Sequence, residues 1–200
     1  SATACSAALC RDGTLTAQSF QCSGLTHSRT LLPMVHDMLD NCGQPLEAVD
    51  VIAVAAGPGS FTGLRIGVAA AKGLAWAAEK PCAPCSTLES MAWPLAHMED
   101  RLIVCAMDAR RKQVYNALFL ARGEELERLS PDRAVSLEEL GAEQPGFKGA
   151  KPVIRSLDSV LRATYSENAG EFSQKTEQEV SQEEFEALCD RLYSKLDNAY

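Results

Sequence analysis

The chain has 200 residues, enough for one core or two small lobes, and its 46% of apolar residues suits a globular protein. The formal net charge of −8 argues against a free-standing nucleic-acid-binding surface, because phosphate binding needs clustered Lys and Arg. No stretch approaches the ~20 consecutive apolar residues of a transmembrane helix.

A β-hairpin is predicted near the start of the chain. The apolar run from Cys5 to Cys10 has the length of a strand, and Arg11-Asp12-Gly13 is a turn signal. The following run, Leu15 to Phe20, alternates apolar and polar residues, as a second strand does.

A helix is predicted next, from about Ser28 to Asn41, because apolar residues recur on one side at helical spacing. Thr26 or Ser28 can cap its first turn, and Gly43 stops it. Pro33 cannot donate a hydrogen bond to the carbonyl of Arg29, so we expect the helix either to start late or to bend there.

The glycine-rich run from Gly57 to Gly67 is the most informative part of the sequence. It follows a predicted strand, Val51 to Ala56, and precedes an Ala-rich helix from about Leu64 to Ala78. Such a turn brings the backbone close to a neighbour and points free helix N–H groups toward a phosphate or another chain. A turn that only closes the fold explains the run equally well. The candidate residues of this turn are Gly57, Gly59, Ser60, Thr62 and Gly63.

Neither familiar phosphate motif fits the run. For a P-loop, Gly59 and Gly63 are one residue too close, and Leu64-Arg65 replaces Lys-Ser/Thr. The dinucleotide fingerprint fails because Thr62 stands where its third glycine belongs. Arg65 is predicted in the first turn of the helix, where a cation opposes the helix dipole. We therefore expect an anionic partner for it, either a carboxylate, which is favoured, or a nucleotide phosphate.

The eight cysteines favour structural thiols. Only Cys82 and Cys85 form a C-x-x-C pair. The pair lies in a predicted short strand, where residues three apart point to opposite faces, which disfavours a metal or redox role. Buried thiols in a reducing cytoplasm are the favoured interpretation.

The second half of the chain opens with another predicted hairpin. Its strands are Leu102 to Met107 and Val114 to Leu120. The turn Asp108-Ala109-Arg110-Arg111 favours a solvated turn with an Asx-type hydrogen bond over a functional charge cluster.

Two capping boxes are predicted further on. In a loop and short helix from Pro131 to Leu140, Ser136 is the cap and Glu139 lies three residues on. After a polar linker from Thr164 to Glu179, the run Ser181-Gln182-Glu183-Glu184 begins an amphipathic helix in the acidic tail, residues 164–200. That helix docks either on its own lobe or in a partner groove.

These motifs together resemble the TsaB family, also called YeaZ, over roughly Ser1 to Leu140. The residues that carry the resemblance are Gly57 to Gly67 with Ala71-Lys72-Gly73-Leu74-Ala75 and Ser86-Thr87-Leu88-Glu89, then His27-Ser28 with Leu31-Leu32-Pro33, then Asp108-Ala109-Arg110-Arg111 with Val114-Tyr115.

The resemblance implies an α/β fold of the actin-like and Hsp70-like ATPase superfamily, with two lobes that each hold a mixed β-sheet and packed helices. It implies an N-terminal lobe over residues 1–95, with the hairpin, two interface helices and the strand, glycine turn and helix. It implies a second lobe over residues 96–200 with the acidic C-terminal helix. The family has one more strand before the hairpin, so the first strand of the sheet is expected to be missing from the chain as given.

The resemblance also implies a function. TsaB proteins are cytoplasmic, non-catalytic partner subunits in making threonylcarbamoyladenosine next to the anticodon in tRNA. They pair with the catalytic subunit TsaD and the ATPase TsaE, form a homodimer when alone, and meet tRNA only indirectly. The two helices are expected to form the interface, although a second helix buried in its own core remains an alternative. The expected interface residues are His27, Leu31, Leu32, Val35, Leu39, Arg65, Val68, Ala69, Lys72 and Trp76.

The sequence gives no pattern for an active site. TsaD holds a metal with an H-x-x-x-H pair, whereas Leu31 stands four residues after His27 and breaks that pair. Ser60 lacks an identifiable base. We therefore expect no catalytic residue, no metal and no cofactor on the isolated chain, with ATP or ADP at the partner interface left open. The alternative is a phosphotransferase or a peptidase-like enzyme of the same superfamily.

Overall fold

The computed structural model describes residues 4–23, 26–111, 113–136, 139–140, 151–156 and 177–179. The chain divides into two compact units, Ser1–Thr87 (unit 1) and Leu88–Tyr200 (unit 2). This division falls earlier than the boundary that the sequence placed after Leu95, because side chains from Leu88 to Leu95 belong to the core of unit 2.

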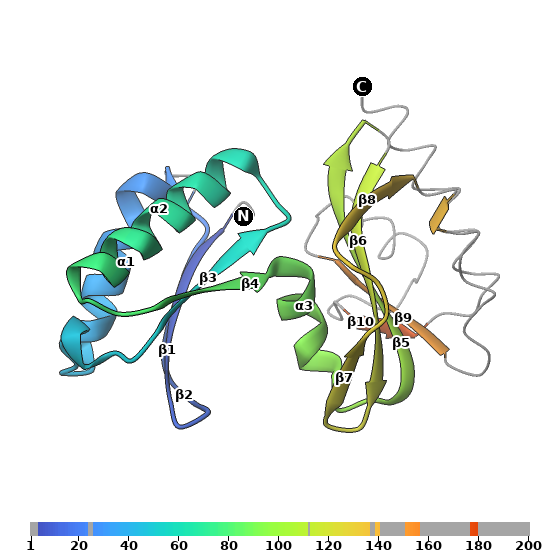
Figure 1. Ribbon diagram of the computed structural model, residues 1–200, viewed down its shortest axis with the longest axis horizontal. Coiled ribbons are helices and arrows are strands. Elements are labelled where there is room, and N and C mark those ends of the chain that lie inside the picture. The colour runs from blue at the N-terminus through green and yellow to red at the C-terminus, as the bar shows by residue number, and fades with distance from the viewer. Residues whose placement is uncertain are drawn as a thin grey trace. The chain divides into compact units, whose positions relative to one another are not determined.

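Unit 1 begins with the predicted hairpin. Strand β1 (Cys5–Arg11) pairs antiparallel with β2 (Thr14–Gln21) (Figure 1). Asp12 and Gly13 between them have φ angles of +51° and +75°. Two consecutive positive φ angles match the right-handed twist of a two-residue hairpin turn, so the turn signal in the sequence is confirmed.

Helix α1 (His27–Asn41) follows, and Pro33 lies inside it without interrupting it. The late start that Pro33 allowed is therefore excluded, and Thr26 takes the N-cap position. Pro33 has no N–H, so the helix lacks one backbone hydrogen bond there. Burial of the apolar side chains of Met34, Met38 and Leu39 offsets that loss. Gly43, at φ +59°, ends the helix as predicted.

The later part of unit 1 folds as strand, turn, helix and strand. A short 3₁₀ turn (Leu46–Ala48) leads to β3 (Ile52–Gly57), and helix α2 (Phe61–Ala77) follows. The prediction that α2 begins near Leu64 is wrong, because Ser60 caps a helix that begins at Phe61, three residues earlier. Strand β4 (Cys82–Ser86) then pairs parallel with β3, as a strand that returns through a helix does.

Both helices of unit 1 cover the same side of its strands (Figure 1). Helix α1 contacts β1 and β2, helix α2 contacts β3 and β4, and the two helices contact each other. In the described residues the strands form two separate two-stranded sheets, β1–β2 and β3–β4. Within the described residues, each of these four strands therefore has one edge without a strand beside it.

Unit 2 is built on a mixed sheet beside one short helix. Helix α3 (Thr87–Ala92) and a 3₁₀ turn (Trp93–Leu95) precede the strands. Strand order is β10-β9-β5-β6-β7, with β8 also paired to β6, and the β5–β9 pair alone among the described pairs of this sheet is parallel. The strands are β5 (Glu99–Arg110), β6 (Gln113–Arg122), β7 (Glu125–Arg128), β8 (Arg133–Ser136), β9 (Lys151–Ser156) and β10 (Glu177–Glu179).

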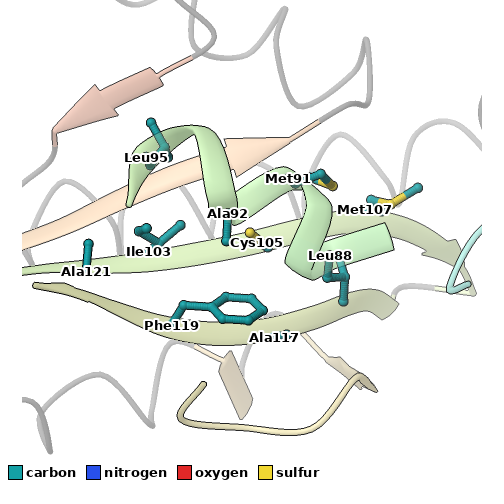
Figure 2. Packing of buried hydrophobic residues seen from close by; sticks show 10 residues of the cluster. All are labelled: Leu88, Met91, Ala92, Leu95, Ile103, Cys105, Met107, Ala117, Phe119 and Ala121. Atoms are coloured by element: carbon teal, nitrogen blue, oxygen red, sulfur yellow. The ribbon is translucent and has the colours of Figure 1, made fainter. Parts of the chain in front are cut away.

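The core of unit 2 lies between α3 and the β5–β6 pair (Figure 2). Leu88 and Leu95 from the helical segment are fully buried, as are Ile103 on β5 and Phe119 on β6. Burying side chains of this size excludes water from the whole interface and contributes roughly 1.5–3 kcal/mol each.

A charged cluster closes one side of this core. Arg128 on β7 donates hydrogen bonds to Glu89 at 2.6 Å and to Asp132 at 2.8 Å, and its guanidinium lies 4.8 Å from the centre of the Phe119 ring. Burial lowers the pKa of Arg128, but the bonds to Glu89 and Asp132 outweigh burial and leave that pKa above its usual value. The cluster ties α3 to the strands across the surface of the core.

The β5–β6 turn confirms the predicted hydrogen bond and corrects the predicted end of the strand. The N–H of Arg110 donates to Oδ1 of Asp108 at 2.6 Å, which is the expected Asx-type hydrogen bond. The strand nevertheless continues to Arg110, and Arg110 and Arg111 take positive φ, at +64° and +54°. Strand β5 therefore ends three residues later than the predicted Met107.

The region around Ser136 also differs from expectation. The capping box is confirmed, since Ser136 N–H donates to Oε2 of Glu139 at 2.9 Å and Glu139 N–H donates to the Ser136 hydroxyl at 3.1 Å. The predicted loop before it is wrong, because Arg133–Ser136 forms β8 against β6. Pairing with a distant strand is a tertiary effect that local turn signals cannot reveal.

Beyond residue 140 only two strands are described. The linker predicted over Thr164–Glu179 is wrong at its end, because Glu177–Glu179 forms β10 against β9. An available sheet edge supplies backbone hydrogen bonds that polar residues accept as well as apolar ones. The helix predicted after Ser181 and its apolar stripe lie outside the described residues.

Candidate interaction surface

Four of the predicted interface residues face the interior of unit 1. His27, Leu31, Val35 and Leu39 of α1 line a cavity of about 480 Å³, which β1, β3 and α2 also line. Leu39 is buried, and the other three are half-buried. These side chains occupy successive turns of one helix stripe, so they share the face of α1 that is turned to the strands.

The other predicted interface residues lie on α1 and α2, and most of them are exposed. Trp76 on α2 is 87% exposed, and Leu32 on α1 is 47% exposed. Arg65, Ala69 and Lys72 on α2 are exposed too, and Val68 is half-buried. A tryptophan that leaves nearly all its surface in water exposes a large apolar area, which a partner could cover. We call Leu32, Arg65, Val68, Ala69, Lys72 and Trp76 the outer helix surface.

The glycine-rich turn starts α2. The hydroxyl of Ser60 accepts a hydrogen bond from the N–H of Gly63 at 3.4 Å, which satisfies one of the free donors of the first turn. Gly57 takes φ +128°, a region that other residues rarely adopt. Gly59 is half-buried and Thr62 is exposed. The geometry gives the turn a clear role in starting the helix.

Arg65 has an aromatic neighbour. Its guanidinium lies 5.3 Å from the centre of the Phe61 ring, one helix turn earlier. The face of an aromatic ring attracts a cation, typically by about 0.5–1 kcal/mol at an exposed site. This contact offsets the dipole penalty that the sequence led us to balance with a carboxylate or a phosphate.

Sequence reasoning missed Phe61 because it assigned this residue to the turn. Phe61 is helical and 74% exposed, so it adds a second aromatic ring to the exposed side of α2. A signal that could have found it is spacing close to multiples of a helix turn, which relates Phe61, Arg65, Lys72 and Trp76. The spacing becomes recognisable once the helix is taken to begin after the N-cap residue Ser60.

The described residues hold no cluster of three His, Cys, Asp or Glu side chains that could bind a metal ion. Within the same ranges, no helix is long and apolar enough to cross a membrane. Cys82 is half-buried and Cys85 is exposed, and both are free thiols on β4. What the described geometry offers is a surface with exposed aromatic and apolar side chains.

The fold and this surface define an α/β protein of mixed sheets and helices with an exposed apolar helix face. A family model described as TsaD, tRNA N6-adenosine threonylcarbamoyltransferase, matches residues 22–180. The chain belongs to this family, and within it to the TsaB (YeaZ) proteins that its relatives represent.

Several relatives carry the name tRNA threonylcarbamoyladenosine biosynthesis protein TsaB, among them those of Bacillus subtilis and Escherichia coli. The protein of Bacillus subtilis is 41% identical over 130 residues, which is 65% of this chain and 56% of the relative. The protein of Escherichia coli is 42% identical over 117 residues, 58% of this chain and 50% of the relative. The chain thus spans about half the length of the curated relatives it matches.

Solved structures share the fold, among them two YeaZ-like proteins. YeaZ from Pseudomonas aeruginosa superimposes with a TM-score of 0.60 at 33% identity, over 66% of this chain and 62% of its own. A protein described as uncharacterized, with similarity to peptidase YEAZ from Pseudomonas aeruginosa, gives a TM-score of 0.63 at 27% identity. That second likeness covers 90% of this chain and 91% of the other.

Proposed function

We propose that this chain is a non-catalytic partner subunit in the biosynthesis of threonylcarbamoyladenosine in tRNA. The family model and the names of the TsaB relatives support this reaction. In the proposal the chain adopts the two-lobed fold of the actin-like ATPases and pairs with a TsaD-type catalytic subunit. A TsaE-type ATPase joins the complex, and tRNA contacts the assembly through the partners.

The observation that carries the proposal is the exposed side of α2. Trp76 is 87% exposed and Phe61 is 74% exposed in a chain whose relatives are named for one biosynthetic process. Exposed aromatic side chains on a helix are typical anchors of protein interfaces. A stable interface of this kind buries roughly 1,200–2,000 Å² in total.

The two sides of α1 then have different roles. The outer helix surface meets the partner, a TsaD-type protein or a second copy of this chain. His27, Leu31, Val35 and Leu39 support the surface from beneath, because they fix α1 against the strands. Small residues such as Ala69 allow a partner helix to approach closely.

The test is capture of a TsaD homologue co-expressed with this chain, followed by a modification assay on tRNA. Trp76→Glu should weaken the complex by about a hundredfold, because a charge buried in a dry interface costs several kcal/mol. Leu32→Glu and Val68→Glu should act in the same direction. Trp93→Glu is the matched control, since Trp93 is 53% exposed and lies in unit 2. Unchanged capture by Trp76→Glu and Leu32→Glu would overturn the assignment of the surface.

Nucleotide binding is proposed only at the partner interface. Arg65 is exposed at the start of α2, where a phosphate of ATP or ADP could reach it once the partner is bound. Arg65→Ala should then weaken nucleotide binding to the complex while partner capture persists. If the same change instead weakens the complex without affecting nucleotide, Arg65 meets a carboxylate of the partner.

A second candidate function follows from the structure described as similar to a peptidase. An enzyme of the superfamily would hydrolyse ATP or peptides as an isolated chain. We propose that the isolated chain does neither. Steady turnover by the purified protein that is lost on substituting one named residue would establish the enzyme instead.

A further inference from the structure

The exposed face of α2 has nearly the same order of side chains from either end. Phe61 and Trp76 stand at the two ends of this face, and both are largely exposed. Arg65 follows the first aromatic ring by four residues, and Lys72 precedes the second by four. Both cations are exposed, and at about 100° per residue all four side chains leave the helix on one face. The face therefore runs aromatic, cation, small middle, cation, aromatic.

The two cations of this face have no acidic neighbour on their own helix, since α2 contains neither Asp nor Glu. Neither Arg65 nor Lys72 forms an ion pair with a residue that the structure describes. The Phe61 ring attracts Arg65, whose guanidinium lies 5.3 Å from the ring centre, but an uncharged ring does not neutralise a cation. Two positive charges therefore accompany the two aromatic rings to any interface that α2 forms.

This order of side chains suits an antiparallel helix that crosses α2 at its middle. The midpoint of the face is Val68–Ala69, where small side chains let a second helix approach closely. A second copy of the chain that docked in this way would place its own Lys72 opposite Arg65 and its own Trp76 opposite Phe61, because the members of each pair are equally far from the midpoint. The aromatic pairs would attract each other, whereas the pairs of cations would repel.

The acidic residues of helix α1 in a second copy do not match the two cations either. The acids of α1 are Asp37 and Asp40, which lie about 4.5 Å apart along the helix axis, against about 10.5 Å for Arg65 and Lys72. Both carboxylates also lie near Nδ1 of His36, at 3.8 Å and 3.3 Å. Helix α1 of a second copy therefore offers carboxylates at the wrong spacing to meet both cations.

We propose that α2 selects an antiparallel helix of a different subunit, whose two carboxylates lie seven residues apart and meet Arg65 and Lys72. Seven residues rise about 10.5 Å and return to the same face of a helix, so these carboxylates match the spacing of the cations. The proposal rests on the proposed function for the existence of that subunit, and it takes a carboxylate rather than a nucleotide phosphate as the partner of Arg65. Charge then decides between the partner and a second copy, while the aromatic rings supply contact area to both.

A charge-reversed copy of this chain is the first probe, because it keeps the shape of the face and changes only its charge. The double variant Arg65→Glu with Lys72→Glu carries two carboxylates seven residues apart on α2. Mixed with the unsubstituted chain, it should form a one-to-one pair at least about tenfold tighter than the self-pair of either chain, measured by sedimentation with one chain labelled. Raising the salt from about 50 mM to about 500 mM should reduce that difference. A mixed pair no tighter than the self-pairs overturns the proposal.

A neutral variant tests the same charges in the complex with a TsaD homologue. Arg65→Gln with Lys72→Gln should weaken that complex about tenfold and tighten the self-pair, and loss of the fold could not produce these opposite changes. The matched control is Arg110→Gln with Arg111→Gln, which removes two exposed cations from unit 2 and should leave both affinities unchanged.

Two outcomes of this second experiment separate the proposals. Equal weakening of the complex by both double variants would mean that net charge alone acts, and charge selection by α2 would be wrong. A TsaD homologue that does not bind the unsubstituted chain contradicts the proposed function. The mixed-copy experiment uses no TsaD homologue, so it decides charge selection by α2 in either case.

Discussion

Unit 1 and unit 2 bury their apolar side chains to different depths. The most buried apolar residues of unit 1 keep 4–8% of their surface, as Ala75 and Met38 do, whereas Ile103 and Phe119 of unit 2 keep none. All but one of the large apolar residues that are exposed in the described ranges lie in unit 1. A unit with a fully buried core is stabilised from within, whereas the exposed aromatic rings of unit 1 are apolar surface that another group could cover.

The largest expected effect sharpens the contrast between the two cores. Phe119→Ala should destabilise unit 2 by about 3–5 kcal/mol, because it removes a fully buried ring and leaves a cavity. Leu39→Ala in unit 1 should fall near the lower end of the range of about 2–5 kcal/mol for such changes, since Leu39 already borders a cavity. Urea unfolding measures both, and hydrogen exchange shows which unit opens. Equal losses would remove the contrast.

A smaller effect comes from the buried polar group of unit 2. Asn116 is fully buried, its Nδ2 donates to the Cys105 carbonyl at 2.9 Å, and its Oδ1 accepts from Nη2 of Arg133 at 3.1 Å. Asn116→Ala should cost about 1–3 kcal/mol in urea unfolding, because the carbonyl is left buried without this donor. Exposed Gln113→Ala on the same strand is the control and should change little. A neutral result for Asn116→Ala would show that water replaces the amide.

Two glycines of unit 1 should respond in opposite directions. Gly57→Ala should cost about 1–3 kcal/mol, because φ +128° disfavours any side chain even though the added carbon meets Leu64 only at an ordinary 3.5 Å. Gly73→Ala, inside α2 with nothing within 4 Å of the added carbon, should stabilise by about 0.5–1 kcal/mol. Thermal unfolding of the two variants measures both signs. Stabilisation by Gly57→Ala would show that the backbone of the turn differs from the one described.

The smallest effect concerns the capping box of unit 2. Hydrogen bonds from the Ser136 backbone N–H and hydroxyl lower the pKa of Glu139 below its usual value. The ionised carboxylate is thus favoured by folding, so its stabilisation is present above the unfolded pKa and is lost as pH falls through the folded pKa. NMR titration of the Glu139 carboxyl should show the lowered pKa, and Ser136→Ala should raise it toward the usual value. An identical titration in both proteins would contradict the assignment.

Local signals in the sequence predicted the elements that depend on a few neighbouring residues. Asp12 and Gly13 made the first hairpin turn, Gly43 ended α1, and Asp108 accepted the bond that shapes the second turn. Each follows from steric freedom or from a side chain that reaches its own backbone, which are properties of short segments. The motifs from Gly57 to Gly67 and around His27 also placed the chain in its family.

Only the tertiary structure decided which neighbours those elements meet. Helical spacing gave α1 an apolar stripe, but it did not show that Leu31 and Val35 face a cavity while Leu32 faces outward. Strands β8 and β10 lie where the sequence predicted loop and linker, because their hydrogen bonds come from distant partners. Periodicity reports that a face is apolar, whereas the identity of what covers it is a non-local property of the whole chain.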